Sequence, residues 1–334
     1  MKKTFYLFII ILIILAGFIY LKWQNLNSTL LITEKTSFKV ESGANAEIIV
    51  NNLAAQNIIK DKTALIWYVK IKKLGDDFIA GTYWLEPEHT SIDLINVLSG
   101  QGEIVGKVTI IEGWDQMQIA AELTEQNIVS GILFLNEVEK GNWRAESKWT
   151  FWDGKPVESD LEGYLYPDTY FFDPEDEAKG VIEKMLSNFD KKLTKELRGE
   201  IKDQDKTIYE VLTLASIVEK EMFGKEDRRM VADIFLKRLE DGIALQSDAT
   251  INYITNKGTT RPSYADLEIQ DPYNTYRNKG LPPGPICNPS IEAIKAVIYP
   301  KSNDYYYFLN TEDGTIIYSK TFEEHVKNKR KYLD

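Results

Sequence analysis

The sequence predicts an α+β protein with an N-terminal transmembrane helix, a small α/β module and a mainly helical C-terminal domain with added short strands. Three observations predict it: an apolar run at the N-terminus, a returning strand-turn-helix pattern, and long helical periodicities after residue 180. A chain of 334 residues is long enough for about two domains. We expect a cytoplasmic N-terminus and transmembrane anchor at 1–22 and the small α/β module at 37–107. An intermediate α/β region at 108–206 is expected to pack on the mainly helical domain at 207–334.

The first segment is expected to cross a membrane. Thr4–Leu21 carries no charge, and at about 1.5 Å per residue its length matches the hydrocarbon core of a bilayer. Lys2 and Lys3 precede it, and positive flanks stay in the cytoplasm. We expect a membrane anchor with the body of the protein on the extracytoplasmic side. The alternative is a cleaved signal peptide, but large apolar residues follow the small residues at 16 and 17.

The pattern of strand, turn and helix occurs three times between residues 38 and 128. In the first copy a strand at 38–40 precedes a turn with Asn45 and a helical stripe at 48–54. A looser copy follows with Thr90 as the helix cap, and in the third copy the sequence at 126–128 repeats the Gln-Asn-Ile of 56–58. Each of these helices has a single apolar face, which must pack against a sheet. Such units also recur by chance in α/β proteins. Those at about 37–107 resemble LysM carbohydrate-binding modules.

Composition excludes several classes of function. The net charge of −11 argues against nucleic acid as a partner, because binding it requires a basic surface. The chain has two histidines, His89 and His325, and one cysteine, Cys287. No internal disulfide can form, a Cys/His metal cage would need nearly all of these residues, and a catalytic triad would need one of the histidines. We expect no metal site, and chemistry that depends on carboxylates.

The region before residue 207 is harder to interpret. Four aromatic residues crowd into ten positions, where they could stack on sugar rings but more often close a core: Trp143, Trp149, Phe151 and Trp152. Val181–Leu197 predicts an amphipathic helix. The charged segment Lys195–Lys206 is expected to be a surface connection.

A largely apolar helix is predicted at 207–222, buried over most of its circumference. Glu219 and Glu221 lie near opposite edges of its apolar arc and cannot face each other. Each is a candidate half-buried carboxylate, and burial without a cation raises a carboxyl pKa toward the range of a general acid. Alternatively, both are structural and held by arginines of the next helix, at positions 228, 229 or 238. Helical geometry alone does not choose between these interpretations.

Polar and proline-rich loops follow this helix. The first is Leu245–Thr250, and the second joins Tyr273–Tyr276 to a run of three prolines at 281–286. Proline fixes the backbone, so the second loop must be rigid and cannot be a helix or a central strand. Rigid loops rich in amides, hydroxyls and tyrosine suit sugar binding.

These residues together resemble the signature of the endolytic murein transglycosylases, the YceG-like or MltG family. The sequence Leu-Ala-Ser-Ile-Val-Glu-Lys-Glu at 214–221 carries the resemblance, with ordered matches at 238–239, 245–250, 273–276, 280–286, 288–289 and 307–308. The Glu-Gly pair at 112–113 and the segment 162–170 also match the family. Ala249 and Ile111 depart from the family, which often has proline at both positions. The resemblance runs from the anchor to about residue 332.

The resemblance implies a single-pass protein of the inner (plasma) membrane, with a LysM-like module and a catalytic domain similar to soluble lytic transglycosylases. It assigns the catalytic role to Glu221, and we give Glu219 a supporting role. The residues expected to bind substrate are Gln246, Asp248, Thr250, Asn274, Thr275, Tyr276, Leu281, Pro282 and Asn288. It implies no cofactor; the partners are glycan strands of peptidoglycan, the membrane and, by expectation, peptidoglycan synthases.

The expected reaction is endolytic cleavage of the β-1,4 bond between N-acetylmuramic acid and N-acetylglucosamine in nascent strands. It leaves 1,6-anhydro ends and terminates glycan elongation. Glu221 would act twice, as acid and then as base, in place of the two carboxylates of ordinary glycosidases. Two alternatives remain: a noncatalytic wall-binding scaffold, and a pyridoxal-phosphate lyase. The lyase would need a Schiff-base lysine and a loop that binds the cofactor's phosphate. Lys220 could be the lysine, but no Gly-rich phosphate loop accompanies it.

Overall fold

The computed structural model describes residues 2–75, 77–101, 104–140, 143–146, 149–173, 176–258, 262–311 and 314–333. They form a mainly helical α+β structure with small antiparallel sheets, as the sequence predicts. The chain folds as two compact units. Unit 1 comprises Met1–Lys107 and Phe171–Glu175, and unit 2 comprises Val108–Tyr170 and Asp176–Asp334.

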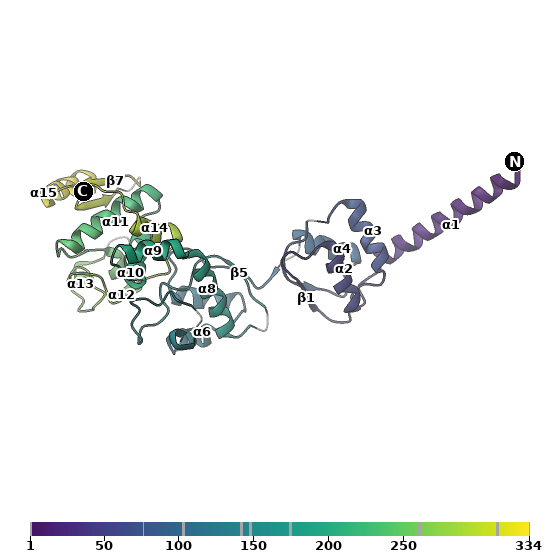
Figure 1. Ribbon diagram of the computed structural model, residues 1–334, viewed down its shortest axis with the longest axis horizontal. Helices are drawn as coiled ribbons and strands as arrows, with labels where there is room; N and C mark the ends of the chain where they lie inside the picture. Colours follow the sequence, from purple (N-terminus) through teal and green to yellow (C-terminus); the bar gives the residue numbers. More distant parts are fainter. Residues whose placement is uncertain are drawn as a thin grey trace. The chain divides into compact units, whose positions relative to one another are not determined.

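Unit 1 contains a small antiparallel sheet with helices packed against it (Figure 1). Its elements are α1 (Lys2–Leu26), β1 (Thr36–Val40), α2 (Ala46–Ala55), α3 (Lys62–Lys72), β2 (Gly81–Leu85), α4 (Ser91–Asn96), the irregular turn η1 (Val97–Gln101) and β3 (Ile104–Val105). The strand order is β1-β2-β3. Phe38 pairs with Tyr83 across β1 and β2, and both side chains are fully buried under Leu53 and Leu65 of the helices. The apolar alternation of the strands therefore forms one core with α2, α3 and α4.

The three related segments adopt the expected strand-turn-helix structure. Asn45 caps α2, and Thr90 forms a capping box on α4. The repeated Gln-Asn-Ile ends α2 and the later helix α5 in the same way: Asn57 and Asn127 have φ values of 55° and 54°. Behind each, the isoleucine N–H donates to the leucine carbonyl five residues earlier, at 3.0 and 2.9 Å. The third segment joins a separate sheet, so the three do not form one layer.

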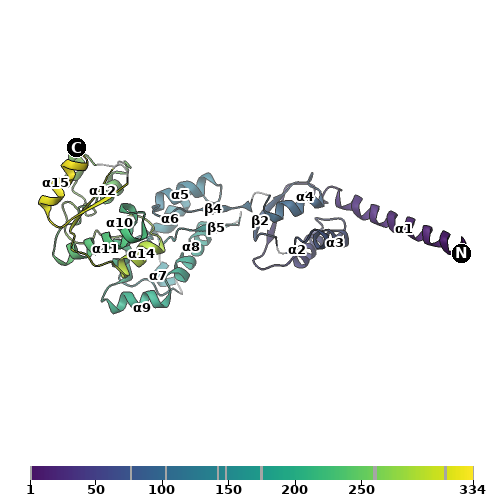
Figure 2. The ribbon, with the colours of Figure 1, turned by 90° about the horizontal axis from the view of Figure 1, so that it is seen from above.

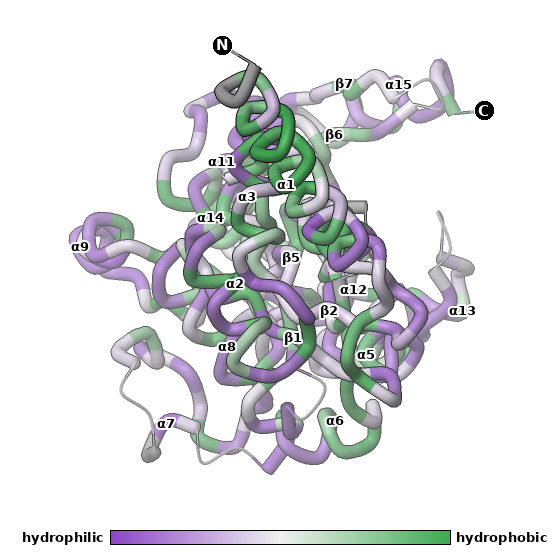
Figure 3. The backbone as a smooth tube through the Cα atoms, turned by 90° about the vertical axis from the view of Figure 1, so that its right-hand side faces the viewer, coloured by the Kyte–Doolittle hydropathy of each residue, from purple (hydrophilic) through white to green (hydrophobic). Residues whose placement is uncertain are grey.

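Helix α1 is apolar along most of its length, as the green N-terminal tube in Figure 3 shows. The stretch Phe5–Leu26 has a mean hydropathy of 2.5 and is long enough to cross a membrane. Its last turn belongs to unit 1. Lys22 Nζ lies 2.8 Å from an Asp61 carboxylate oxygen, Asn25 donates to the same carboxylate, and Leu26 is buried in the core.

Unit 2 is mainly helical. Its elements are α5 (Gln116–Glu125), α6 (Gly131–Glu139), α7 (Trp143–Glu146), α8 (Ala178–Lys192), α9 (Lys195–Asp203), α10 (Ile208–Glu221), α11 (Lys225–Glu240), α12 (Asp248–Thr255), α13 (Tyr264–Leu267), α14 (Ile291–Ile298), β6 (Tyr307–Asn310), β7 (Ile316–Ser319) and α15 (Phe322–Tyr332). Strands β4 (Lys107–Thr109) and β5 (Thr169–Phe171) pair in a sheet, and β6 and β7 form a hairpin. Phe151 and Trp152 are buried against Tyr164, so these aromatic residues close a core.

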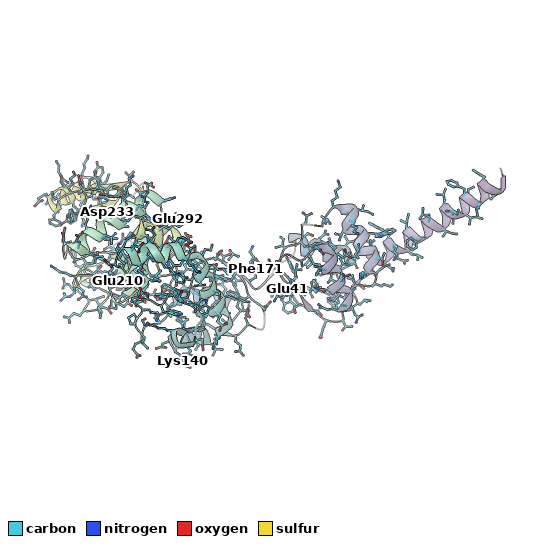
Figure 4. The ribbon with its side chains drawn as sticks, in the orientation of Figure 1. Glu41, Lys140, Phe171, Glu210, Asp233 and Glu292 are labelled. Carbon is cyan, nitrogen blue, oxygen red and sulfur yellow. The ribbon has the colours of Figure 1, made fainter. Side chains whose placement is uncertain are left out.

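Helix α10 is central in unit 2 and packs against α9, α11, α12 and α14, which surround it in Figures 1 and 2. Thr207 and Glu210 form a capping box at its start (Glu210 is labelled in Figure 4). All residues from Val211 to Glu219 are buried. The helix ends after Glu221 because Met222 is extended, with φ −138° and ψ 139°. This leaves Glu221 at the C-terminal end of a rigid, buried helix.

Two helices differ from the sequence prediction. The charged segment after residue 195 is the helix α9, which the hydrophilic colouring in Figure 3 matches, and not a surface connection. Thr194 caps it, and Leu197 and Ile201, one turn apart, bury its single apolar stripe. The prediction missed this stripe because it consists of two residues among charged ones. The helix α3 in unit 1 was not predicted either.

Candidate active site

Glu219 and Glu221 have different surroundings, although only Lys220 separates them. Glu219 is 6% exposed, and one of its oxygens accepts a hydrogen bond from Arg228 at 2.5 Å. The other accepts from the backbone N–H and the hydroxyl of Ser290, at 2.9 and 2.5 Å. Arg228 also donates to the Met222 carbonyl. Glu219 is therefore a paired structural carboxylate that ties α10 to α11 and α14.

Glu221 has no such cation. The Ser247 hydroxyl donates to its Oε1 at 2.5 Å, and among the residues that the structure describes no lysine or arginine pairs with it. Burial raises the pKa of Glu221 to about 7, and the negative charge of Asp248 adds to the rise. Hydrogen bonds from Ser247 and the Ala249 N–H oppose it. The side chain remains partly exposed. Near neutral pH this carboxyl can therefore both donate and accept a proton.

A network of hydroxyl groups fixes Ser247. Its backbone N–H donates to Thr275 Oγ1 at 3.0 Å, and its carbonyl accepts from the Thr250 hydroxyl at 2.8 Å. The hydroxyls of Thr250 and Thr275 bond to each other at 2.9 Å. Both threonines are buried, with at most 1% exposure. They position Ser247, and through it Glu221, rather than offering surface to a ligand.

Asp248 and Tyr276 form a second polar pair beside the carboxyl of Glu221. The Tyr276 hydroxyl donates to Asp248 Oδ1 at 2.5 Å, and both side chains are partly exposed. Gln246 lies next to them with an exposed side chain, whose amide oxygen accepts from Arg238 at 2.6 Å. Its φ of 54° turns the chain sharply before α12. Of the nine predicted substrate contacts, these three have polar groups at the surface beside Glu221.

Two asparagines predicted to contact substrate are fully buried. Asn274 donates to the carbonyls of Leu267 and Ile269 and accepts from the Tyr276 N–H. The side chain of Asn288 bonds to the Leu165 N–H, the Trp114 carbonyl and Glu162, and its backbone bonds to Trp114 and Gly113. The amide groups of both residues are therefore engaged within the protein, where they shape the loops.

The proline-rich loop is anchored on α10. Ser216 Oγ accepts from the Ile286 N–H at 3.0 Å, and the Cys287 thiol donates to the Ser216 carbonyl at 3.3 Å. Leu281 is half-buried and Pro282 is buried. A Cβ on Gly284 would lie 2.3 Å from the Tyr209 hydroxyl, so a larger residue there would have to displace the tyrosine side chain. The loop is rigid, as the sequence predicts for its prolines.

Sequence reasoning missed two residues. Ser247, the direct partner of Glu221, stood within the polar stretch 245–250, but nothing in its spacing from 221 showed that they meet. Glu162 is buried, and burial raises its pKa well above the usual range. It accepts from the Gln116 N–H at the start of α5 and from Asn288. The Lys220 ammonium donates to the Gly113 carbonyl at 3.0 Å and so lies on another side of α10.

The family to which the chain belongs follows from how much of the chain one family model matches. The YceG-like family model matches residues 38–331. The chain belongs to the YceG-like family. The match covers the core of unit 1 and nearly all of unit 2, including α10 and the loops around Glu221.

Relatives of this YceG-like chain include endolytic murein transglycosylases from two bacteria. One, from Bacillus subtilis, is 33% identical over 89% of the chain and 84% of its own length. One from Streptococcus pneumoniae is 30% identical over 98% of the chain, which spans 64% of that protein. The crystal structure of a YceG-like protein from Listeria monocytogenes matches with a TM-score of 0.62 and 32% identity, covering 90% of the chain and all of the matched chain. These matches establish the YceG-like fold.

Proposed function

We propose that this protein is an endolytic murein transglycosylase, a lyase of peptidoglycan, and that Glu221 is its catalytic acid and base. The observation that carries the proposal is the contrast at the end of α10: Glu219 is neutralised by Arg228, whereas Glu221 keeps a raised pKa and a partly exposed side chain. The names of the relatives from Bacillus subtilis and Streptococcus pneumoniae support the reaction class.

The reaction uses Glu221 twice. The protonated carboxyl donates its proton to the glycosidic oxygen between N-acetylmuramic acid and N-acetylglucosamine, and the C–O bond breaks through an oxocarbenium-like state. The resulting carboxylate accepts the proton of the muramoyl 6-hydroxyl as that oxygen bonds to the anomeric carbon. The product end is a 1,6-anhydro sugar, no water is consumed, and the cut terminates a growing strand.

Ser247 supports both steps through its hydrogen bond to Oε1. It orients the carboxyl, and it stabilises the carboxylate after the proton has left. The intramolecular 6-hydroxyl brings a high effective concentration, so no second nucleophile is needed. Gln246, Asp248 and Tyr276 are our remaining candidates for substrate contacts. Thr250, Asn274, Thr275 and Asn288 act by positioning these loops, and Leu281 and Pro282 form the wall beside them.

We also propose that α1 is retained as a membrane anchor. Lys22 and Asn25 bond to Asp61, which caps α3, and Leu26 fills the core of unit 1. These contacts make the end of α1 part of a folded unit. The large apolar residues that follow positions 16 and 17 favour a single-pass anchor in the inner (plasma) membrane over a cleaved signal. The two basic residues at 2–3 then place the body outside the cytoplasm.

For unit 1 we propose a LysM-like role in holding glycan near the anchor. The β1-α2-α3-β2 order, with antiparallel strands under two helices, supports this. Peptidoglycan synthases are the proposed protein partners, because an anchored enzyme that cuts nascent strands must work where they emerge. Local polar and stacking contacts must hold the substrate, since a net charge of −11 gives no long-range attraction to an anionic wall.

The test is to incubate the full-length protein and its Glu221→Gln variant with nascent, uncross-linked glycan and identify the new ends by mass spectrometry. We expect internal cuts with 1,6-anhydro ends from the wild type and none from the variant, which keeps the shape and lacks the acid. A variant that still formed anhydro ends would refute the assignment of Glu221. A wild type that bound glycan and left it uncut would instead indicate a noncatalytic scaffold.

A further inference from the structure

A second carboxylate is held beside the proposed acid. Ser247, which bonds to Glu221, is followed directly by Asp248, the first residue of α12. The Tyr276 hydroxyl, from the rigid loop after residue 271, fixes the Asp248 carboxylate at 2.5 Å. The cycle described above gives this carboxylate no part in moving the proton, since Glu221 alone does so.

The position of Asp248 is specified by several contacts. Ser247 and Tyr276 are both attached to the buried hydroxyl network, because Thr275 accepts from the Ser247 N–H and immediately precedes Tyr276. Asn274 accepts from the Tyr276 N–H at 2.9 Å and is fully buried. The acid and the second carboxylate are therefore held by one rigid assembly, and neither needs a ligand to order it.

We propose that Tyr276 is a positioning residue that fixes the charge of Asp248 beside Glu221, so that a second carboxylate keeps the catalytic proton in place until substrate binds. This inference rests on the proposed function. A fixed negative charge disfavours a second negative charge nearby, so Glu221 retains its proton. The effect is strong where water is scarce, and burial already raises the pKa of Glu221.

The other charged groups near Glu221 do not cancel this effect. Lys220 and Glu219, on the same helix, are engaged with the Gly113 carbonyl and with Arg228 and Ser290. Arg238, from α11, bonds to Gln246 and to the Ala244 carbonyl. Its positive charge acts on Tyr276, and Asp248 remains the charged neighbour that raises the pKa of Glu221.

The test measures the rate of anhydro-end formation against pH for full-length wild type, Asp248→Asn, Tyr276→Phe and the double variant. In Asp248→Asn the alkaline limb of the pH–rate profile, where the rate falls as Glu221 loses its proton, should move to lower pH by about one unit. Above pH 7 this is about a tenfold loss of rate. Tyr276→Phe should move it in the same direction by less, because the freed carboxylate turns toward solvent. The double variant should match Asp248→Asn alone.

Tyr306→Phe and Asp241→Asn provide a matched control. Tyr306 donates to Asp241 at 2.7 Å in an exposed pair of the same chemistry, bonded to neither Glu221 nor Ser247. Neither change should move the limb. An unshifted limb in Asp248→Asn, or a shift of equal size in the control, overturns the inference while leaving the proposed function intact. Anhydro ends from Glu221→Gln would overturn the proposed function itself.

Discussion

Glu219 and Glu221 leave the same turn of α10 in opposite directions, the first to the guanidinium of Arg228 and the second to the hydroxyl of Ser247. One carboxylate is neutralised and buried, while the other keeps a raised pKa and a path to solvent. A single helical turn thus separates a structural role from the proposed chemical one. Both roles depend on residues far away in the sequence.

Replacing Glu219 by Gln should destabilise the protein more than it impairs chemistry. Arg228 would remain buried without its carboxylate, which costs about 3–5 kcal/mol. We expect a clear drop in the thermal midpoint of unfolding. Glu226→Gln is the matched control on α11, because Glu226 pairs with Arg229 and Lys301 at the surface, and its midpoint should stay close to that of the wild type. Equal midpoints for the two variants would contradict a structural role for Glu219.

The activity of the wild type should fall as the pH rises through about 7, because the first step needs protonated Glu221.

The stability of the fold should depend on the ionisation of the same carboxyl group, that of Glu221. Its folded-state pKa, about 7, lies above the usual glutamate value of 4.5, so the proton stabilises the fold at low pH and this contribution is lost as the pH rises through 7. Glu221→Gln should therefore exceed the wild type in stability at pH 8, by at most about 3 kcal/mol, and match it near pH 4. Unfolding midpoints at both pH values test this, and a gap independent of pH would count against it.

The sequence predicted what depends on neighbours in the chain. Asn45 and Thr90 cap their helices as expected, because a cap bonds to an N–H three residues away. Helical geometry could not predict which of Glu219 and Glu221 is paired within the protein, because this depends on Ser290 and Ser247, which only folding brings close to them. Family resemblance chose Glu221 instead.

The substrate contacts show a second limit of sequence reasoning. An amide-rich loop has the same composition whether its amides bond to sugar or to its own backbone. Asn274 and Asn288 prove to bond to the backbone and to Glu162, while Gln246 presents its side chain at the surface. Burial, which decides between these cases, is a property of the whole fold.

Replacing Ser247 by Ala should slow the reaction and shift its pH dependence. The hydroxyl stabilises the charged form of Glu221, so its loss raises the pKa further and moves the alkaline limb to higher pH, opposite to Asp248→Asn. A lost hydrogen bond to a charged group costs about 1.5–3 kcal/mol, or roughly ten- to a hundredfold in kcat. Ser302→Ala, at an exposed serine, is the control. A limb that moved to lower pH would contradict the proposed contact.

The two histidines and the cysteine should be dispensable for chemistry. His89 accepts from the Glu86 N–H in a turn of unit 1, and His325 stacks on Tyr307 at 5.4 Å. Cys287 is buried, and its thiol bonds to the Ser216 carbonyl. Changing both histidines to Ala and Cys287 to Ser should leave kcat within about twofold, since Ser keeps the donor; the buried site should cost about 1 kcal/mol in stability. Loss of anhydro ends from a folded triple variant would refute a mechanism that uses Glu221 alone.

The contacts at the end of α1 and the retention of α1 in the mature protein are tested separately. Lys22 and Asn25 bond to the carboxylate that also caps α3, so Asp61→Ala removes the cap and both contacts. A lost cap costs about 1 kcal/mol, and we expect unit 1 of this variant to be more sensitive to limited proteolysis near residue 30. Lys35→Ala, which breaks an exposed pair with Glu86, should not change the sensitivity of unit 1 to proteolysis.

Mass spectrometry of the membrane fraction should find peptides that begin before residue 17 in the wild type. A mature protein that begins after the small residues at 16 and 17 would mean that α1 is a cleaved signal.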